Sequence, residues 1–193
     1  AYFRCIPNLT IASPLNEHEL RHLMYTAQLP NQGPFVIRYP RGKGVLIDWK
    51  NKMEQVEIGT GVQLKDGKQA VVLSLGPIGN TAAQAIATLE ATYGITIAHY
   101  NMRFLKPLDY TILNTVGKQF SHIFTIEDGV LAGGLGSAVI EYMCDNVLLP
   151  KVKRLGIPDQ FIEHGTPAEL YHMLGLDAEG IAAAIIKQLD LKL

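Results

Sequence analysis

The residues best suited to bind a charged ligand follow a short apolar stretch near the amino terminus. Arg38, Arg41 and Lys43 crowd into the string RYPRGKG, directly after a predicted strand at 34–37. Pro40 and the neighbouring glycines favour a tight turn with accessible backbone. A guanidinium held there can donate two parallel hydrogen bonds to a phosphate or carboxylate, and each charge-assisted bond contributes about 1.5–3 kcal/mol. A basic surface turn explains these residues equally well, so the residues alone leave both interpretations open.

A second candidate is a glycine-rich loop between a predicted strand at 123–126 and a predicted helix at 135–143. The acidic pair Glu127-Asp128 precedes the string GGLG at 133–136. This string is not the dinucleotide fingerprint G-x-G-x-x-G. Its glycines fit either close packing of the helix or an anion cradle at the helix N-terminus, and the acidic pair favours packing.

Histidines and cysteines offer little for metal chemistry. His18 and His22 lie four residues apart on a predicted helix at 17–27, but no third ligand is close in sequence, so no metal site is predicted. Cys5 and Cys144 lack the spacing of a metal site. We expect both to be buried thiols of a reducing compartment.

The composition is that of a globular protein without a special partner. Among 193 residues, 17 Lys and Arg oppose 18 Asp and Glu, and 48% are hydrophobic. The charge balance excludes the basic surface typical of nucleic-acid or membrane binding. No apolar run is long enough to span a membrane, which predicts a soluble, cytoplasmic protein. The opening residues 1–7 resemble the interior of a fold and predict a chain that begins inside a domain.

From residue 69 onward, apolar strands alternate with amphipathic helices. This alternation predicts an α/β fold in which helices cover both faces of a mostly parallel, three-layer sheet. The polar strand at the end of the series is expected near a sheet edge. The predicted strands are 69–75, 95–100, 123–126 and 151–156, and the predicted helices are 82–92, 110–120, 135–143, 167–173 and 178–189. The predicted N-caps are Asn80 or Thr81 for the first of these helices, Asp109 for the second and Asp177 for the last.

The amino-terminal third predicts a separate piece of structure. A strand at 8–12, a helix at 17–27 capped by Asn16, and the strand at 34–37 form one βαβ unit. Asp66-Gly67 predicts a hairpin between the strands on either side of it. The predicted division is 1–44 as the tail of one domain, 45–68 as a linker with Trp49 and the first hairpin strand, and 69–193 as a second domain.

Four motifs, taken together, resemble the 1-deoxy-D-xylulose-5-phosphate synthase family of transketolase-like thiamine diphosphate enzymes. They cover the chain from end to end, and their order and spacing make the resemblance specific. The motifs are FVIRYPRG at 35–42, RFLKPLD at 103–109, EDG with GGLGS within 127–137, and EHGT at 163–166 followed by GLDA at 175–178.

The resemblance implies a fold and an activity. The family condenses pyruvate, with loss of CO2, and D-glyceraldehyde 3-phosphate for isoprenoid (methylerythritol phosphate), thiamine and pyridoxal biosynthesis. It uses thiamine diphosphate and Mg2+ and forms homodimers. This chain matches the tail of the family's pyrimidine-binding domain and its transketolase-like carboxy-terminal domain. Such a piece is expected to be inactive alone and to bind no cofactor. A stand-alone interaction or oligomerisation module is the alternative.

Carried over by position, the resemblance assigns one ligand residue. Arg41 matches the arginine that binds the phosphate of glyceraldehyde 3-phosphate, and Arg38, Tyr39 and Gly42 support its loop. The family's cofactor-activating glutamate, metal ligands and catalytic histidines have no counterpart in this chain, so no catalytic residue and no metal site are expected here. The family commonly has an acidic residue before its RFLKPLD string, but Asn101-Met102 precedes it here, which leaves the ion-pair partner of Arg103 open.

Overall fold

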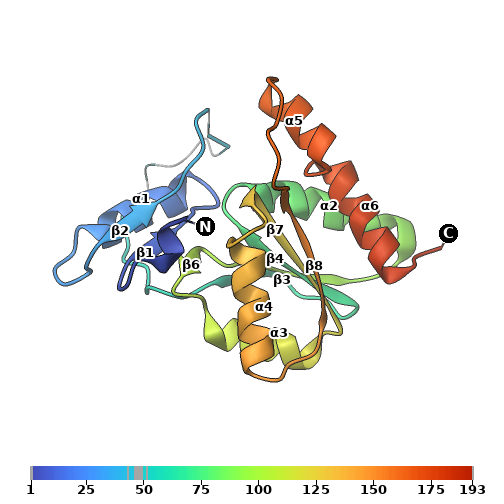
Figure 1. Ribbon diagram of the computed structural model, residues 1–193, viewed down its shortest axis with the longest axis horizontal. Coiled ribbons are helices and arrows are strands. Elements are labelled where there is room, and N and C mark those ends of the chain that lie inside the picture. The colour runs from blue at the N-terminus through green and yellow to red at the C-terminus, as the bar shows by residue number, and fades with distance from the viewer. Residues whose placement is uncertain (1, 43, 46–49, 51, 193) are drawn as a thin grey trace.

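The computed structural model describes residues 2–42, 44–45, 50 and 52–192. It contains two sheets, of which the larger lies at the centre of the molecule and the smaller lies to one side with helix α1 (Figure 1). The large sheet has the strand order β3-β5-β4-β7-β8, and the small sheet has the order β2-β1-β6. Lys43 and Trp49 lie outside the described residues.

Four of the five strands of the large sheet run parallel, and β3 runs antiparallel to β5 at one edge. Every residue of β4 is buried, because this strand has neighbours on both sides and helices on both faces. Strand β8 lies at the opposite edge, as its polar sequence predicted. The strands are β3 (Val62–Lys65), β4 (Ala70–Leu75), β5 (Ile97–Asn101), β7 (His122–Val130) and β8 (Lys151–Ile157).

Helices cover both faces of the large sheet, which confirms the predicted three-layer α/β fold (Figure 1). Alternate residues of β4 and β7 enter opposite layers: Val72 and Phe124 pack towards α2 and α6, whereas Val71 and Ile123 pack towards α3 and α4. Helix α5 projects beyond the sheet (Figure 1). The helices are α2 (Ile78–Tyr93), α3 (Tyr110–Gln119), α4 (Leu135–Asp145), α5 (Pro167–Leu174) and α6 (Ala178–Leu189).

The small sheet is built from distant parts of the sequence. Its central strand pairs in parallel with the next strand along the chain and antiparallel with β6, which follows β5 of the large sheet. The sequence did not predict β6, because its two apolar residues stand between Arg103 and Lys106 and give neither an alternating pattern nor a longer apolar run. Arg103 adopts a positive φ of 53° and turns the chain from β5 into β6. The elements are β1 (Thr10–Ala12), α1 (Glu17–Ala27), β2 (Phe35–Ile37), β6 (Phe104–Lys106) and the 3-10 helix η1 (Tyr2–Cys5).

The predicted hairpin across Asp66-Gly67 is wrong. Strand β3 pairs with β5, and β4 lies on the far side of β5. The loop crosses the first residues of β5 so closely that a Cβ on Gly67 would lie 2.1 Å from the backbone nitrogen of Ala98. The glycine therefore permits a crossing rather than a tight turn.

Helix ends follow the predicted capping residues with one exception. The side chains of Asn16, Asp109 and Asp177 accept hydrogen bonds from the first turns of α1, α3 and α6. Helix α2, however, begins four residues before its predicted start, with Pro77 as its cap. Asn80 bonds the carbonyl oxygens of Leu15 and Pro77 instead of capping the helix.

The prediction that both cysteines are buried is also wrong, since Cys5 and Cys144 are exposed. Cys5 belongs to the short surface helix η1. Cys144 lies on the outer side of α4, whose inner side buries Val139 and Met143. None of the described helices has the length and apolar character needed to cross a membrane.

Candidate functional site

The loop Arg38–Gly42 lies where strands of both sheets end. Arg38 follows β2, and its Nη2 lies 3.1 Å from Oδ2 of Asp128, near the carboxyl end of β7. At the end of β4, Gly76 approaches the loop after β1 so closely that a Cβ would lie 2.3 Å from Oγ of Ser13. Carboxyl ends of parallel strands are the usual place for ligands in open α/β sheets. The two sheets thus meet at the edge where a ligand is expected.

The two arginines of the loop have different surroundings. Arg38 is fixed by its backbone, because its N–H donates to the carbonyl oxygen of Ala12 over 2.8 Å and its carbonyl oxygen accepts from Oγ of Ser13 over 3.0 Å. Its side chain is fixed by Asp128. Arg41 is exposed and pairs with no side chain in the described part of the chain. The two arginines therefore differ in their contacts: Arg38 is held by its backbone and side chain, whereas Arg41 is exposed.

A groove of about 270 Å³ lies beside this loop. Tyr39 and Gly42 line one side, and Tyr39 is 62% exposed, so its ring forms an open wall rather than part of the core. Leu15 and Leu20 line the other side, next to Pro77 at the start of α2. The predicted supporting residues Tyr39 and Gly42 thus border a concave surface. The third predicted supporting residue, Arg38, directly precedes Tyr39 in the chain.

Glu19 supplies the ion-pair partner that the sequence left open for Arg103. The buried carboxylate of Glu19 accepts hydrogen bonds from Arg103 Nε and from Nδ2 of Asn101, the latter at 3.0 Å. It also accepts from the N–H of Leu15 just before α1. Asn101, which lies just before the RFLKPLD string, therefore donates to the same carboxylate that neutralises Arg103.

The glycine-rich loop before α4 packs against an internal carboxylate. The N–H groups of Leu135 and Gly136 donate to Oε2 and Oε1 of Glu127 over 2.8 and 2.9 Å. A Cβ on Gly134 would lie 2.1 Å from Glu127 Oε2, so this position requires glycine. Burial raises the pKa of the Glu127 carboxyl, and the two N–H groups oppose that rise.

The described residues do not form a cradle for a diphosphate at this loop. The N-terminus of α4 has the exposed amide groups and the dipole that would attract an anion, but Glu127 already occupies them. The packing interpretation of the glycine loop therefore holds. Glu127 belongs to the acidic pair from which the sequence predicted packing rather than anion binding, and its carboxylate occupies the position that an anion would take.

One group of described residues brings three potential metal ligands within 4.8 Å: His172, Asp177 and Glu179. It lies on the exposed connection between α5 and α6. His172 Nδ1 is 2.6 Å from Asp177 Oδ2, and the other oxygen of Asp177 accepts from the N–H of Gly180 to cap α6. Mg2+ prefers six oxygen ligands, so this group fits a helix connection rather than a magnesium site.

Two further histidines, His22 and His99, make hydrogen bonds within the fold. His22 was one of the two histidines considered as metal ligands. Its Nδ1 accepts a hydrogen bond from the N–H of Glu54 over 2.8 Å, so this nitrogen is already occupied. His99 is buried in β5, and its Nε2 lies 2.8 Å from Oγ of Ser74. Burial lowers the pKa of His99 to about 4, so its ring is neutral at physiological pH.

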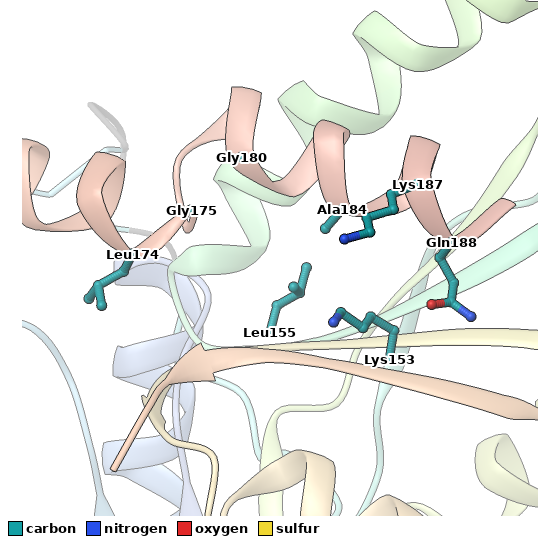
Figure 2. Close-up of a pocket in the computed structure, with 8 residues that line it drawn as sticks. All are labelled: Lys153, Leu155, Leu174, Gly175, Gly180, Ala184, Lys187 and Gln188. Carbon is teal, nitrogen blue, oxygen red and sulfur yellow. The ribbon is translucent and has the colours of Figure 1, made fainter. Parts of the chain in front are cut away.

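A second cavity, of about 390 Å³, lies between β8 and α6 (Figure 2). Lys153 extends towards it from β8, beside the side chain of Leu155, and Lys187 faces it from α6 (Figure 2). None of the residues predicted to bind a ligand lines it. The candidate site is therefore the junction of the two sheets rather than this cavity.

Comparison with known proteins agrees with the motifs. The family model described as the transketolase C-terminal domain matches residues 59–181, and that of the transketolase pyrimidine binding domain matches residues 1–45. A 1-deoxy-D-xylulose-5-phosphate synthase from Bacteroides thetaiotaomicron is 60% identical over 99% of this chain, which covers 30% of that protein. The enzyme of the same name from Vibrio vulnificus is 40% identical over 96% of this chain and 29% of its own length.

Solved structures share the fold. A split gene transketolase, described as an inactive beta4 tetramer, superposes with a TM-score of 0.82 at 31% identity over 98% of this chain and 60% of its own. A mutant transketolase from Pichia stipitis superposes with a TM-score of 0.70 at 16% identity, over 98% of this chain and 26% of its own.

The chain spans about 30% of the length of the curated relatives it matches. The transketolase C-terminal domain model alone covers more than half of this chain, and the fold superposes on the split gene transketolase over 98% of this chain. The chain belongs to the transketolase C-terminal domain family.

Proposed function

We propose that this chain is the carboxy-terminal part of a 1-deoxy-D-xylulose-5-phosphate synthase. The observation that carries the proposal is 60% identity to such an enzyme over nearly the whole chain. The whole protein joins pyruvate, after loss of CO2, to D-glyceraldehyde 3-phosphate. It works as a cytoplasmic homodimer with thiamine diphosphate and Mg2+. The described residues offer neither the cofactor cradle nor the metal site, so no step of the reaction is assigned to them.

Within that enzyme, Arg41 binds the phosphate of glyceraldehyde 3-phosphate. Its guanidinium is exposed and has no partner among the described side chains, so it is available for a doubly charged ligand. Its loop lies at the junction of the two sheets, beside the groove bordered by Tyr39. Arg38, whose charge Asp128 neutralises, supports the loop rather than the ligand.

The test is the steady-state kinetics of Arg41→Ala in the whole protein. Loss of charge-assisted hydrogen bonds to phosphate should raise the KM for glyceraldehyde 3-phosphate about 10- to 150-fold. The KM for pyruvate should stay within about twofold, because pyruvate carries no phosphate. Lys118→Ala, which removes an exposed cation from α3, is the matched control. Equal rises for the two substrates would refute the phosphate role.

The second candidate is a stand-alone interaction or oligomerisation module. It is favoured by the split gene transketolase, because that structure matches 98% of this chain and is described as an inactive tetramer. An immunoblot of the source cells distinguishes the two candidates. A band much larger than 21.2 kDa supports the synthase, whereas a band at that mass supports the module. Calorimetry adds a second criterion, since we expect thiamine diphosphate to bind the whole synthase and not this chain alone.

A further inference from the structure

We propose that Asp128 is a positioning residue that, together with Tyr171, fixes the loop Arg38–Gly42 and thereby orients Arg41 towards the substrate phosphate. The inference rests on the proposed function for the identity of the substrate. It adds two residues from the carboxy-terminal domain to a site that sequence motifs place wholly in the loop after β2.

One carboxylate oxygen joins three elements of the fold. Oδ2 of Asp128, on β7, lies 3.1 Å from Nη2 of Arg38 and accepts a hydrogen bond from the hydroxyl of Tyr171 over 2.8 Å. Arg38 directly follows β2 of the small sheet, and Tyr171 belongs to α5, which projects beyond the large sheet (Figure 1). The residues lie within the segments matched by two different family models, at 1–45 and 59–181. The contact therefore fixes one segment relative to the other.

Tyr171 keeps the carboxylate in place. Burial and the bond to Asp128 raise the pKa of the Tyr171 hydroxyl to about 12, so the hydroxyl stays protonated and donates throughout the working pH range. The same oxygen therefore accepts from both the Tyr171 hydroxyl and the Arg38 guanidinium. The side chain of Asp128 is 21% exposed and that of Arg38 is 51% exposed, so the carboxylate is the more buried partner of the pair.

Arg38 is the last residue of the loop that the rest of the molecule fixes. Its backbone bonds to Ala12 and Ser13 and its side chain bonds to Asp128, whereas Tyr39 and Arg41 are exposed and form no hydrogen bond within the described part of the chain. Pro40 restricts the backbone between them, because its ring fixes φ. The orientation of Arg41 therefore depends on how firmly Arg38 is held three residues earlier.

The ion pair is half exposed, and solvent screening makes it a small contribution to the stability of the fold. Its effect should appear in the loop and in phosphate binding. Asp128 acts through its contact with Arg38, so we expect it to change the KM for the phosphorylated substrate and not kcat.

The experiment uses the whole protein with Asp128→Asn, Asp128→Glu, Tyr171→Phe and Arg41→Ala. Asp128→Asn removes the charge but keeps the size of the side chain, and should raise the KM for glyceraldehyde 3-phosphate about fivefold, the upper range for a half-exposed ion pair. The KM for pyruvate and kcat should stay within about twofold. Tyr171→Phe should raise the same KM about twofold, and Asp128→Glu should restore most of the loss. Asp159→Asn, an exposed aspartate after β8, is the matched control.

Hydrogen exchange of the peptide that contains residues 36–42 gives a readout that does not depend on activity. Asp128→Asn should speed exchange in this peptide and leave the peptides of β4 and β7 unchanged. Unchanged exchange would overturn the proposal whatever the kinetics. If Arg41→Ala raises the KM and Asp128→Asn does not, the positioning role fails while the proposed function stands. If Arg41→Ala has no selective effect, the phosphate role itself fails, and the inference about orientation fails with it.

Discussion

The two sheets of the molecule are stabilised in different ways. The large sheet buries both faces, and an extensive apolar cluster lies on each side of it. The small sheet shares one face with the large unit, because Leu9 and Ile11 join the cluster under α3 and α4. Its other face forms a cluster of only four buried residues, and one of them, Phe104, comes from β6. Strand β2 at its edge is half exposed.

The difference shows that the candidate site lies where the extensively buried large sheet supports the less buried small sheet. The chain of the large unit leaves β5, turns at Arg103, adds β6 to the small sheet and returns to α3. Polar contacts at the same junction are made by Glu19, Asp128 and Lys106. Lys106 Nζ donates to the carbonyl oxygens of Arg4 and Ile6. The loop that carries Arg41 belongs to the weaker unit, and the contacts that fix it come from the stronger unit.

The largest effect is expected from truncating the core of the large sheet. Phe124→Ala empties a fully buried site between β7 and the layer of α2 and α6, and should cost about 3–5 kcal/mol of unfolding free energy. Native-state hydrogen exchange should show this loss in all central strands, because they unfold as one cooperative unit.

The matched variant is Phe104→Ala, which removes the same side chain from the four-residue cluster of the small sheet. It should lower the free energy of opening for the amides of β1 and α1 and leave that of β4 and β7 within about 0.5 kcal/mol. If Phe104→Ala lowers the protection of β7 as much as Phe124→Ala does, the two sheets unfold together and the comparison is wrong.

The sequence predicted the large sheet and its helices well, because the signals that specify them come from residues close together in the chain. Hydrophobic period, capping residues such as Asp109 and Asp177, and the polar character of β8 depend on residues close in the chain. The Asp66-Gly67 signal failed because a two-residue turn and a crossing over β5 require the same glycine, and only the partner strand distinguishes them.

The candidate site was less predictable, because its contacts are distant in sequence. Without the family resemblance, Arg38 and Arg41 are equivalent in the string RYPRG. In the structure they differ because Arg38 contacts Ala12, Ser13 and Asp128, the last of which lies 90 positions along the chain. Glu19 and Arg103 are 84 positions apart. One signal was present: an acidic residue before a glycine-rich helix start is the residue type that caps such a helix from within, as Glu127 does.

Acidification should weaken the large sheet before the small one. Among the described residues, His99 is the only buried histidine, and it belongs to the large sheet. Burial lowers its pKa from 6.5 to about 4, so the unfolded chain binds a proton that the folded chain does not bind in this window. The free energy of unfolding therefore has its full value above pH 6.5, where the ring is neutral in both states. It falls by about 3 kcal/mol as the pH decreases to 4.

Glu127 acts in the opposite direction, because a raised carboxyl pKa favours folding at low pH. The difference between the wild type and His99→Gln isolates the histidine. We expect hydrogen exchange in β4 and β5 to become faster between pH 6.5 and 4, after correction for intrinsic rates, and His99→Gln to flatten this dependence. An equal loss of protection in β1 and α1 would show that the buried histidine does not distinguish the two sheets.

The smallest effect concerns the return of the chain from the small sheet to the large one. Asp109 follows β6, caps α3 through a 2.9 Å bond from the N–H of Ile112, and accepts from the N–H of Gly61, before β3, over 2.8 Å. Asp109→Ala should cost about 1–2 kcal/mol, the loss of one cap and one further hydrogen bond to a charged group.

Asp109→Asn separates the two contributions, because one amide oxygen can accept either bond but cannot carry the charge. We expect Asp109→Asn to lose about half as much unfolding free energy as Asp109→Ala. The control is Asp145→Ala, which removes an exposed carboxylate from the last turn of α4 and should change the unfolding free energy by less than about 0.5 kcal/mol. Exchange should accelerate at the starts of α3 and β3 and not in β1. If the amides of β1 respond more than those of α3, Asp109 stabilises the small sheet, and β6 is fixed by the helix cap rather than by its pairing with β1.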